Sequence, residues 1–508
     1  MMELLGALIP SALAQHAPVL LVVVPLILSP VAAVMPNGRI AWVIALIGVA
    51  FTVLMLPPLF AGVQADAVMS YALGGWAAPL GIEYRVDALN LPILALVGII
   101  GFLCTLYALP SVADEVDEGK RAIFYATFLV CFAGLLGVAV TGDAFNVFVF
   151  VEISSLSTYG LIAMGAGRDR RALTASYNYL VLGTIGATFF VIGVGFLYMA
   201  TGTLNMADMA RVLAENGHDR VTQAGFAFIV VGLGLKAAMF PLHVWLPNAY
   251  AFAPNFVTAF LASTATKVAF YALIRFLFSV YHPDVTFVDL SSTWVFAVVG
   301  TIAMIVASVQ AVFQTDARRV LAYSSVAQVG YMMLGLGIGS ADGLAAGLLH
   351  LMNHAMMKGA LFMALGAFAL NYGVSRVKDL AGMGKSMPAT SVAFTFGGLS
   401  LVGVPLTIGF TSKWYLILAA LENGWWWAVA ALILSSLLAL AYVARLLMPI
   451  WFENAPTHGG AVPKVQRVPW LMAVPMGILA LANIYFFFHA APIVNLARGA
   501  ANAVMGGF

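Results

Sequence analysis

The sequence predicts an all-α polytopic membrane protein with about fourteen transmembrane helices, and three observations lead to this fold class. The chain has 508 residues, of which 63% are hydrophobic and 9% are charged, whereas soluble domains carry about 25% charged residues. Apolar stretches of the roughly 20 residues needed to cross a bilayer follow one another almost from end to end. Lysine and arginine gather in alternate loops between these stretches, as they do where loops face the cytoplasm.

The expected helices are runs of apolar residues bounded by polar or turn-forming residues. They cover residues 16–35, 40–62, 88–110, 121–141, 144–166, 172–201, 223–245, 255–280, 292–313, 320–339, 341–371, 390–420, 424–451 and 467–490. The stretch 63–87 contains Gly74, Gly75 and Gly81 and is predicted to form a small external hairpin. Residues 204–222 are predicted to form a polar external loop.

The basic residues of the loops test this helix count independently. Thirteen lie in loops after odd-numbered helices: Arg39, Lys120, Arg121, Arg168, Arg170, Arg171, Arg318, Arg319, Arg376, Lys378, Lys385, Lys464 and Arg467. Four lie in the other loops and the C-terminal tail: Arg85, Arg211, Arg220 and Arg498. Because cytoplasmic loops accumulate Lys and Arg, this asymmetry supports fourteen helices in a bacterial inner membrane with both termini on the external side.

Several classes of function are excluded by composition. A net charge of +2 without a basic, aromatic-rich run argues against nucleic-acid binding. Cys104 and Cys131 lie in apolar stretches without metal-ligand spacing, so we interpret them as small core residues. The sequence contains no glycine-rich phosphate loop and no metal motif. We therefore expect the chain to hold no metal and no redox cofactor.

Six basic residues fall inside predicted helices instead of loops. They are Lys236, Lys267, Arg275, Lys358, Lys413 and Arg445. A lysine or arginine at the middle of a membrane helix costs about 2.5–3.5 kcal/mol, so the four lysines together would cost about 10 kcal/mol. We expect water or a partner charge to offset that cost. Arg275 and Arg445 lie close enough to helix ends for their side chains to reach the interface, and we assign them no further role.

Glu152 is the only acidic residue deep within a predicted helix. One acid among several buried bases favours an ion pair with a lysine, because the carboxylate stabilises the charged amine whereas burial stabilises the neutral amine. Separating such a pair would drive a proton onward. The alternative interpretation is a static ion pair that fixes helix packing.

Two of the predicted helices are expected to be interrupted. Pro241 and Pro247 follow Lys236, and Pro405 precedes Lys413. Proline kinks or breaks a helix, and broken helices at membrane depth line ion cavities. Similar interruptions in the two halves of the chain suggest an internal repeat.

His350, His354 and Lys358 recur every four residues, which places them on one helix face. Histidine has an unperturbed pKa of about 6.5 and can both accept and release protons. We interpret the three residues as a proton wire that Lys267 links to the first interrupted helix; the alternative is hydrogen-bonded packing. Polar residues that could support water in this region are Tyr323, Ser324, Ser325 and Gln328.

These residues resemble the antiporter-like subunits shared by multisubunit Mrp-type Na⁺/H⁺ antiporters, respiratory complex I and membrane-bound hydrogenases. The similarity spans roughly residues 80–450. Its most specific passages are residues 150–157, 236–254 with Lys267, 315–325, the His350/His354/Lys358 file and residues 409–413. The family's common Leu-Pro-Asp-Ala-His run is Leu-Pro-Asn-Ala-Tyr here, so Asn248 and Tyr250 remove two titratable groups at a cytoplasmic proton entrance.

The resemblance implies two inverted five-helix repeats with helices 7 and 12 broken. The implied divisions are residues 1–120 with the hairpin, a first repeat at 121–280, a second repeat at 292–451, and a last helix and tail at 452–508. By the same resemblance, Glu152 pairs with Lys236, Lys267 and the histidine file form the central relay, and Lys413 is the terminal proton site. The pattern is most similar to the D-type subunit of the Mrp-type antiporters.

We therefore expect a proton-translocating subunit of a multisubunit antiporter that exchanges H⁺ for Na⁺ or another monovalent cation. It would work beside other membrane subunits as a transporter and not as an enzyme. The alternative is an antiporter-like proton-pumping subunit of complex I, an NADH:quinone oxidoreductase, or of a membrane-bound hydrogenase. A third class, a scaffold that conducts no ions, is disfavoured by the number of buried charges.

Overall fold

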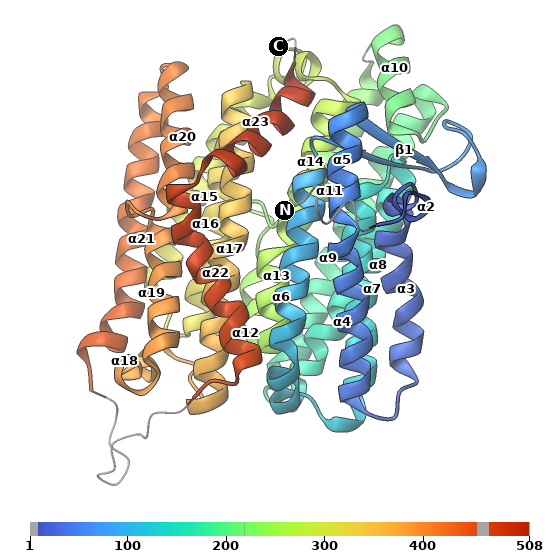
Figure 1. Ribbon diagram of the computed structural model, residues 1–508. Helices are drawn as coiled ribbons and strands as arrows, with labels where there is room; N and C mark the ends of the chain where they lie inside the picture. Colours follow the sequence, from blue (N-terminus) through green and yellow to red (C-terminus); the bar gives the residue numbers. More distant parts are fainter. Residues whose placement is uncertain (1–8, 218, 455–466, 507–508) are drawn as a thin grey trace.

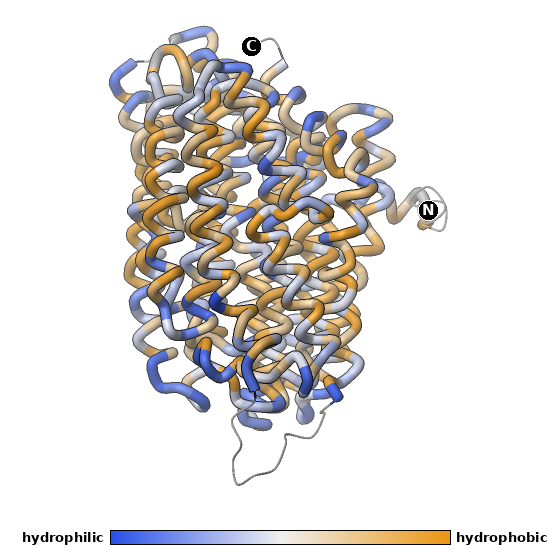
Figure 2. Tube along the Cα trace, turned by 90° about the vertical axis from the view of Figure 1, so that its left-hand side faces the viewer, coloured by the Kyte–Doolittle hydropathy of each residue, from blue (hydrophilic) through white to orange (hydrophobic). Residues whose placement is uncertain are grey.

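The computed structural model describes residues 9–217, 219–454 and 467–506, which fold almost entirely into helices. Most of the long helices run roughly side by side along one axis, and a two-stranded hairpin lies near one end of the bundle (Figure 1). Hydrophobic residues extend along the length of the bundle, while hydrophilic residues gather at its two ends (Figure 2). This distribution suits a bundle surrounded by lipid, where helices satisfy their own backbone hydrogen bonds.

The first part of the chain runs from the N-terminal helices through the hairpin to the first interrupted helix. Its elements are α2 (Ser11–Ala14), α3 (Ala17–Ala33), α4 (Gly38–Leu54), α5 (Leu56–Asp66), β1 (Val68–Ala72), η1 (Leu73–Gly75), β2 (Glu83–Asp87), α6 (Leu91–Glu115), α7 (Glu118–Val140), α8 (Ala144–Ala163), η2 (Met164–Gly167), α9 (Arg171–Thr201), α10 (Met206–Asn216), α11 (Arg220–Lys236) and α12 (Leu246–Phe252).

The second part contains the central helix and ends on a helix that follows the last span. Its elements are α13 (Asn255–Ser263), α14 (Ala265–Ile274), η3 (Arg275–Val280), η4 (Val285–Asp289), α15 (Ser292–Phe313), α16 (Ala317–Gly337), α17 (Ala341–Tyr372), η5 (Val377–Leu380), α18 (Met383–Ser386), α19 (Pro388–Val402), α20 (Ile408–Glu422), α21 (Trp426–Phe452), α22 (Trp470–Phe488) and α23 (Ala491–Met505).

The predicted fold class is confirmed. Among the described residues, eleven helical segments are long and apolar enough to cross a membrane. The other three expected stretches are helical too: α3 is a shorter apolar helix, and α11–α12 and α19–α20 are interrupted pairs. Every one of the fourteen predicted stretches therefore has a helical counterpart. Lys464, which was counted among the loop residues, lies outside the described residues.

Both predicted interruptions are present. Helix α11 ends at Lys236 and α12 begins at Leu246, while α19 ends at Val402 and α20 begins at Ile408. The predicted span over 255–280 is present, but Thr264, with φ −125° and ψ −56°, separates it into α13 and α14. Its hydroxyl donates to a backbone carbonyl one turn earlier. Hydroxyl side chains compete in this way with the backbone bonds of a helix, and neither proline nor glycine marks the position.

The hairpin prediction is confirmed, but two polar segments are more ordered than expected. Strands β1 and β2 pair antiparallel, with Val68 opposite Asp87. The expected loop 204–222 contains helix α10, which buries Met206, Met209 and Leu213 on one face. The tail forms α23, which packs against the central helix α17. The last residues of α23 lie beside the hairpin, around one cavity.

We call the end of the bundle that carries the hairpin, α10 and α23 the hairpin end (Figure 1). The start of α3 belongs to it as well, because His16 Nδ1 lies 3.0 Å from the Tyr71 hydroxyl of β1. We call the opposite end, where Arg168, Arg318 and Arg319 lie, the arginine end. Between the two ends, α17 is buried over most of its length and contacts helices from both parts of the chain.

Candidate functional site

Lys236 forms the predicted ion pair with Glu152. The lysine is the last residue of α11, so its charge lies at the negative end of that helix dipole. Its Nζ donates to Glu152 Oε1 at 3.3 Å and to Ser155 Oγ at 2.6 Å. Its side chain is 6% exposed, against 21% for Glu152. The carboxylate is therefore partly accessible from outside the protein, whereas the ammonium is almost inaccessible.

Lys267 lies just after the unexpected break between α13 and α14. Its side chain is fully buried, and Nζ donates to the carbonyl oxygen of Ala262 and, at 3.3 Å, to the hydroxyl of Thr266. Ala262 belongs to the last turn of α13, where helix carbonyls lack partners within the helix. The break thus supplies an oxygen ligand for a lysine that forms no ion pair with any carboxylate of the described residues.

The file on α17 is a single buried row, as its spacing predicts. His350 contacts the hydroxyl of Ser412 through Nδ1 (3.0 Å) and Gln328 Oε1 through Nε2 (2.9 Å). The ring of His354 lies parallel to that of His350, with 6.4 Å between centroids. Both ring nitrogens of His354 are buried without a hydrogen-bond partner among the described residues. Such a group needs water or a transient partner.

Lys358, the third member of the file, is bonded to the neighbouring helix α16. Its Nζ donates to the carbonyl oxygen of Leu321 at 2.7 Å and to the hydroxyl of Ser324 at 2.5 Å. Of the four polar residues expected to support the region, Ser324 and Gln328 therefore contact the file directly. Ser325 instead donates to the carbonyl of Leu321 within its own helix.

Lys413 reaches back across the break between α19 and α20. Its Nζ donates to the carbonyl oxygens of Leu401 (3.2 Å) and Val402 (2.8 Å), the last two residues of α19. A third bond goes to the hydroxyl of Ser436 at 3.1 Å, and the ring of Tyr331 lies 4.6 Å from the ammonium. The negative end of a helix dipole and an aromatic face both favour a cation.

The predicted residues are brought into one row by the packing of their helices. Helices α11 and α14 pack together, as do α13 and α17, and α17 and α20. Lys267 and Lys358 lie close enough to His354 for their charges to act on it. At the far end, His350 contacts Ser412, the residue before Lys413. Among the described residues, Lys236 is the only one of the four lysines in an ion pair.

The expectation that the side chain of Arg275 reaches the interface from a helix end was wrong, because this residue is buried. Its guanidinium is buried and forms a two-pronged ion pair with Asp87 of the hairpin, at 2.7 and 2.8 Å. Burial raises the pKa of Asp87, but the charge of Arg275 and the hydrogen bonds at the site outweigh burial and hold this pKa below its ordinary value. Arg445, by contrast, is exposed near the arginine end.

A buried polar junction at the arginine end was missed as well. Glu115 accepts from both the backbone and side-chain nitrogens of Asn255, at 2.7 and 2.8 Å, and from Arg168 at 2.8 Å. Arg318 donates to the side chain of the same asparagine. These residues come from four separate segments of the chain, so no local pattern marks the junction.

The two residues that differ from the family's common run at the expected proton entrance both form hydrogen bonds. Asn248 Oδ1 accepts from Arg319 at 2.6 Å, and the buried hydroxyl of Tyr250 donates to the carbonyl of Leu261 at 3.2 Å. Within the described residues, no group of three or more His, Cys, Asp or Glu side chains is placed to hold a metal ion.

Taken together, the fold and the row of buried lysines and histidines define an antiporter-like membrane subunit. The family model described as NADH:quinone oxidoreductase/Mrp antiporter, TM, matches residues 141–439. The chain belongs to this family.

Its relatives include both branches of that family. The N-type subunit of NADH-quinone oxidoreductase from Desulforudis audaxviator is 39% identical over 488 residues, covering 92% of this chain and 95% of that protein. The D-type subunit of the Na(+)/H(+) antiporter from Alkalihalophilus pseudofirmus is 31% identical over 444 residues, covering 87% of each chain. In the structure of the Mrp complex from Dietzia sp. DQ12-45-1b, one chain is 26% identical with a TM-score of 0.86, covering 97% of this chain and 98% of that one.

Proposed function

We propose that this chain moves protons across a bacterial cell membrane along the row Lys236, Lys267, His354, His350 and Lys413, with Lys358 beside it. It would do so within a multisubunit complex that exchanges H⁺ for Na⁺ or another monovalent cation. The observation that carries the proposal is the row itself, since buried titratable side chains from four helices meet inside the bundle.

The surroundings of these lysines support a role in proton transfer over a purely structural role. Burying a lysine is costly, and a packing position is filled at less cost by an apolar residue. Three of the four lysines are held only by neutral oxygens within the described residues, so each can give up its proton without leaving a carboxylate unpaired. Glu152 would set the charge of Lys236 at one end, and we expect water at the unpartnered nitrogens of His354.

We place the arginine end on the cytoplasmic side, following the charge of its loops. The relatives support the existence of partners, because they are subunits of an NADH-quinone oxidoreductase and of a Na(+)/H(+) antiporter, and the similar solved chain comes from an Mrp complex. In the antiporter the partners would be other membrane subunits, and the sodium gradient or proton gradient would supply the energy.

The proposal is tested in everted vesicles that contain the chain together with the membrane subunits with which it assembles. Na⁺ or K⁺ is added to vesicles with an imposed pH gradient, and collapse of the gradient is followed with a pH-sensitive dye. We expect cation-dependent collapse that Lys236→Ala and Lys413→Ala abolish. Arg39→Ala, which removes an exposed cation at the start of α4, should leave the exchange intact. Unchanged exchange in both lysine variants, at equal amounts of assembled complex, would show that the assigned row is wrong.

A second candidate is a proton-pumping subunit of a redox enzyme, favoured by the 39% identity to the N-type subunit of an NADH-quinone oxidoreductase. The same vesicles separate the two functions. If a pH gradient forms only on addition of a respiratory electron donor, and added cations cause no exchange, the redox pump is correct and the proton row is retained.

A further inference from the structure

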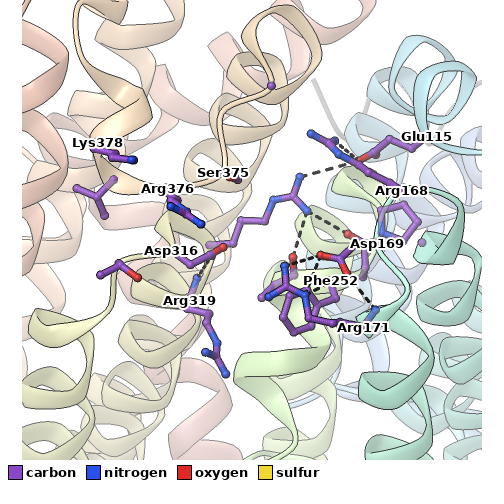
Figure 3. A pocket seen from close by; sticks show the side chains of 18 of the residues that line it. Glu115, Arg168, Asp169, Arg171, Phe252, Asp316, Arg319, Ser375, Arg376 and Lys378 are labelled. Atoms are coloured by element: carbon purple, nitrogen blue, oxygen red, sulfur yellow. Dashed lines mark hydrogen bonds and ion pairs between the residues drawn. The ribbon is translucent and has the colours of Figure 1, made fainter. Parts of the chain in front are cut away.

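A cavity of about 830 Å³ opens at the arginine end between the two predicted repeats. One wall comes from residues 165–171 and 251–254, and the other from residues 315–319, 373–378 and 445–453. Figure 3 shows Arg376 and Lys378 on the left wall and Arg168 with Glu115 on the right. The proton row does not use these side chains.

The lining carries more positive than negative charge. Its basic residues are Arg168, Arg171, Arg318, Arg319, Arg376, Lys378 and Arg445, and its acidic residues are Glu115, Asp169, Asp316 and Glu453. Three of the acids are already occupied. Glu115 binds Arg168 at 2.8 Å, Asp169 binds Arg171 at 2.6 Å, and Asp316 accepts from a backbone nitrogen at the start of α16. These two ion pairs leave five cations of the cavity against Asp316 and Glu453, so positive charge remains in excess.

Arg376, Lys378 and Arg445 form no ion pair within the described part of the chain, and all three are exposed to the cavity. Arg376 and Lys378 stand at and just before the start of η5, and Arg445 is brought to them because α21 packs against η5 in the folded chain. In addition, Nε of Arg319 is buried without a hydrogen-bond partner in the described residues. Loop charge alone explains basic residues on this side, but it does not explain their convergence on one cavity.

We propose that this cavity binds a phosphate group, with Arg376, Lys378 and Arg445 as its principal ligands. Guanidinium groups bind phosphate through paired N–H donors, and basic pockets between membrane helices hold anionic headgroups. The adjoining end of α21 exposes Trp451 and Phe452, and aromatic side chains mark the level of the lipid headgroups. An anionic phospholipid is therefore the source that the surroundings favour, and free phosphate shares the same chemistry.

A phosphate group in this position would join η5 to α21, the two elements of one wall that carry its ligands. It would also offset the positive charge close to Asn248, whose partner Arg319 lines the same cavity. Binding does not depend on which transport function is correct, because it is measured without transport.

The test compares two variants that each remove three cations from loops or helix ends of the same side. The pocket variant carries Arg376→Gln, Lys378→Gln and Arg445→Gln. The matched control carries Arg39→Gln, Lys120→Gln and Arg170→Gln, none of which lines the cavity. Each is purified with its partner subunits in detergent, stripped of lipid and titrated with phosphatidylglycerol, phosphatidylcholine, inorganic phosphate or glycerol 3-phosphate. The readouts are the melting temperature and lipid counts by native mass spectrometry.

We expect phosphatidylglycerol to raise the melting temperature of the wild type and the control at similar concentrations. Each surface cation contributes roughly a fivefold gain in binding to an anionic lipid, so the pocket variant should bind about a hundredfold more weakly. If inorganic phosphate or glycerol 3-phosphate acts at the same site, the source is a soluble phosphate and the site is still supported.

Two results would overturn the proposal: equal losses in the pocket variant and the control, or a wild-type response to phosphatidylcholine as strong as that to phosphatidylglycerol. A pocket variant that fails to fold is replaced by Lys378→Gln alone, with a fivefold weakening expected. The charge-retaining variant Arg376→Lys with Arg445→Lys should keep most of the binding.

Discussion

The ion pair between Glu152 and Lys236 permits a quantitative prediction. Glu152→Gln keeps the shape of the side chain but removes the charge that lies 3.3 Å from Lys236 Nζ. Two unit charges at this separation attract by about 5 kcal/mol at an effective dielectric constant of roughly 20. Because the glutamate is 21% exposed, water screens part of this attraction. We use about 3 kcal/mol, the lower end of the range for breaking a buried pair.

A loss of about 3 kcal/mol lowers the ratio of charged to neutral lysine by roughly a hundredfold. If charging of Lys236 is a step in transport, the initial rate of cation-dependent gradient collapse should fall by a similar factor. The assay uses everted vesicles, with rates normalised to the amount of assembled complex. Glu118→Gln, which neutralises an exposed acid at the start of α7, should stay within twofold of the wild type.

A rate for Glu152→Gln within threefold of the wild type would refute this reasoning. The exchanged variant, with Glu152→Lys and Lys236→Glu, separates a relay from a static pair. It restores the attraction between α8 and α11 but moves the lysine to the other helix. Normal assembly with lost transport agrees with a relay, whereas full recovery of transport would identify the pair as a packing device.

Two further predictions concern stability. A Cβ at Gly409 would overlap the carbonyl oxygen of Ser400, so Gly409→Ala should destabilise the α19–α20 break by roughly 3 kcal/mol and lower the melting temperature. Gly477→Ala is the control, because Gly477 has open space around it, and it should leave the melting temperature unchanged. Equal melting temperatures of the two variants would contradict the close contact at Gly409. Asp87 has a pKa below its ordinary value of 3.8 because Arg275 outweighs burial, so its contribution is present above that pH and lost as the pH falls further. The Asp87→Asn variant should therefore have a lower melting temperature than the wild type at pH 7, and its melting temperature should fall less on acidification. Parallel pH profiles of the melting temperature would show that the pair contributes nothing to stability.

The sequence predicted the fold where the signal was local. Runs of apolar residues marked the spans, and proline marked the breaks after Lys236 and before Lys413. The break at Thr264 carried no such mark, because a hydroxyl bonded to its own helix is common in continuous helices too. Helix α10 was missed because its apolar residues are few, although Met206, Met209 and Leu213 follow helical spacing.

The candidate site was predictable as a set of residues but not as a set of contacts. Glu152 was expected to pair with a lysine because it was the one acid at membrane depth, and the family resemblance pointed to Lys236, which is its partner in the structure. Ser155, three residues further on the same helix face, could have been added from spacing alone. The partner of Arg275 lies 188 residues away in the hairpin, and such a pairing follows only from the packed structure.

The carbonyl ligands of Lys267 and Lys413 have a consequence for the movement of solvent. Both ammonium groups cover oxygens at the ends of α13 and α19 that have no partner within their own helix. When either side chain swings away, a water molecule must replace it, because a bare carbonyl is costly in an apolar interior. Each excursion of charge is thus tied to the uptake of a solvent molecule. Impermeant osmolytes, which withdraw water from narrow internal spaces, should slow proton transfer along the row without competing with any ion.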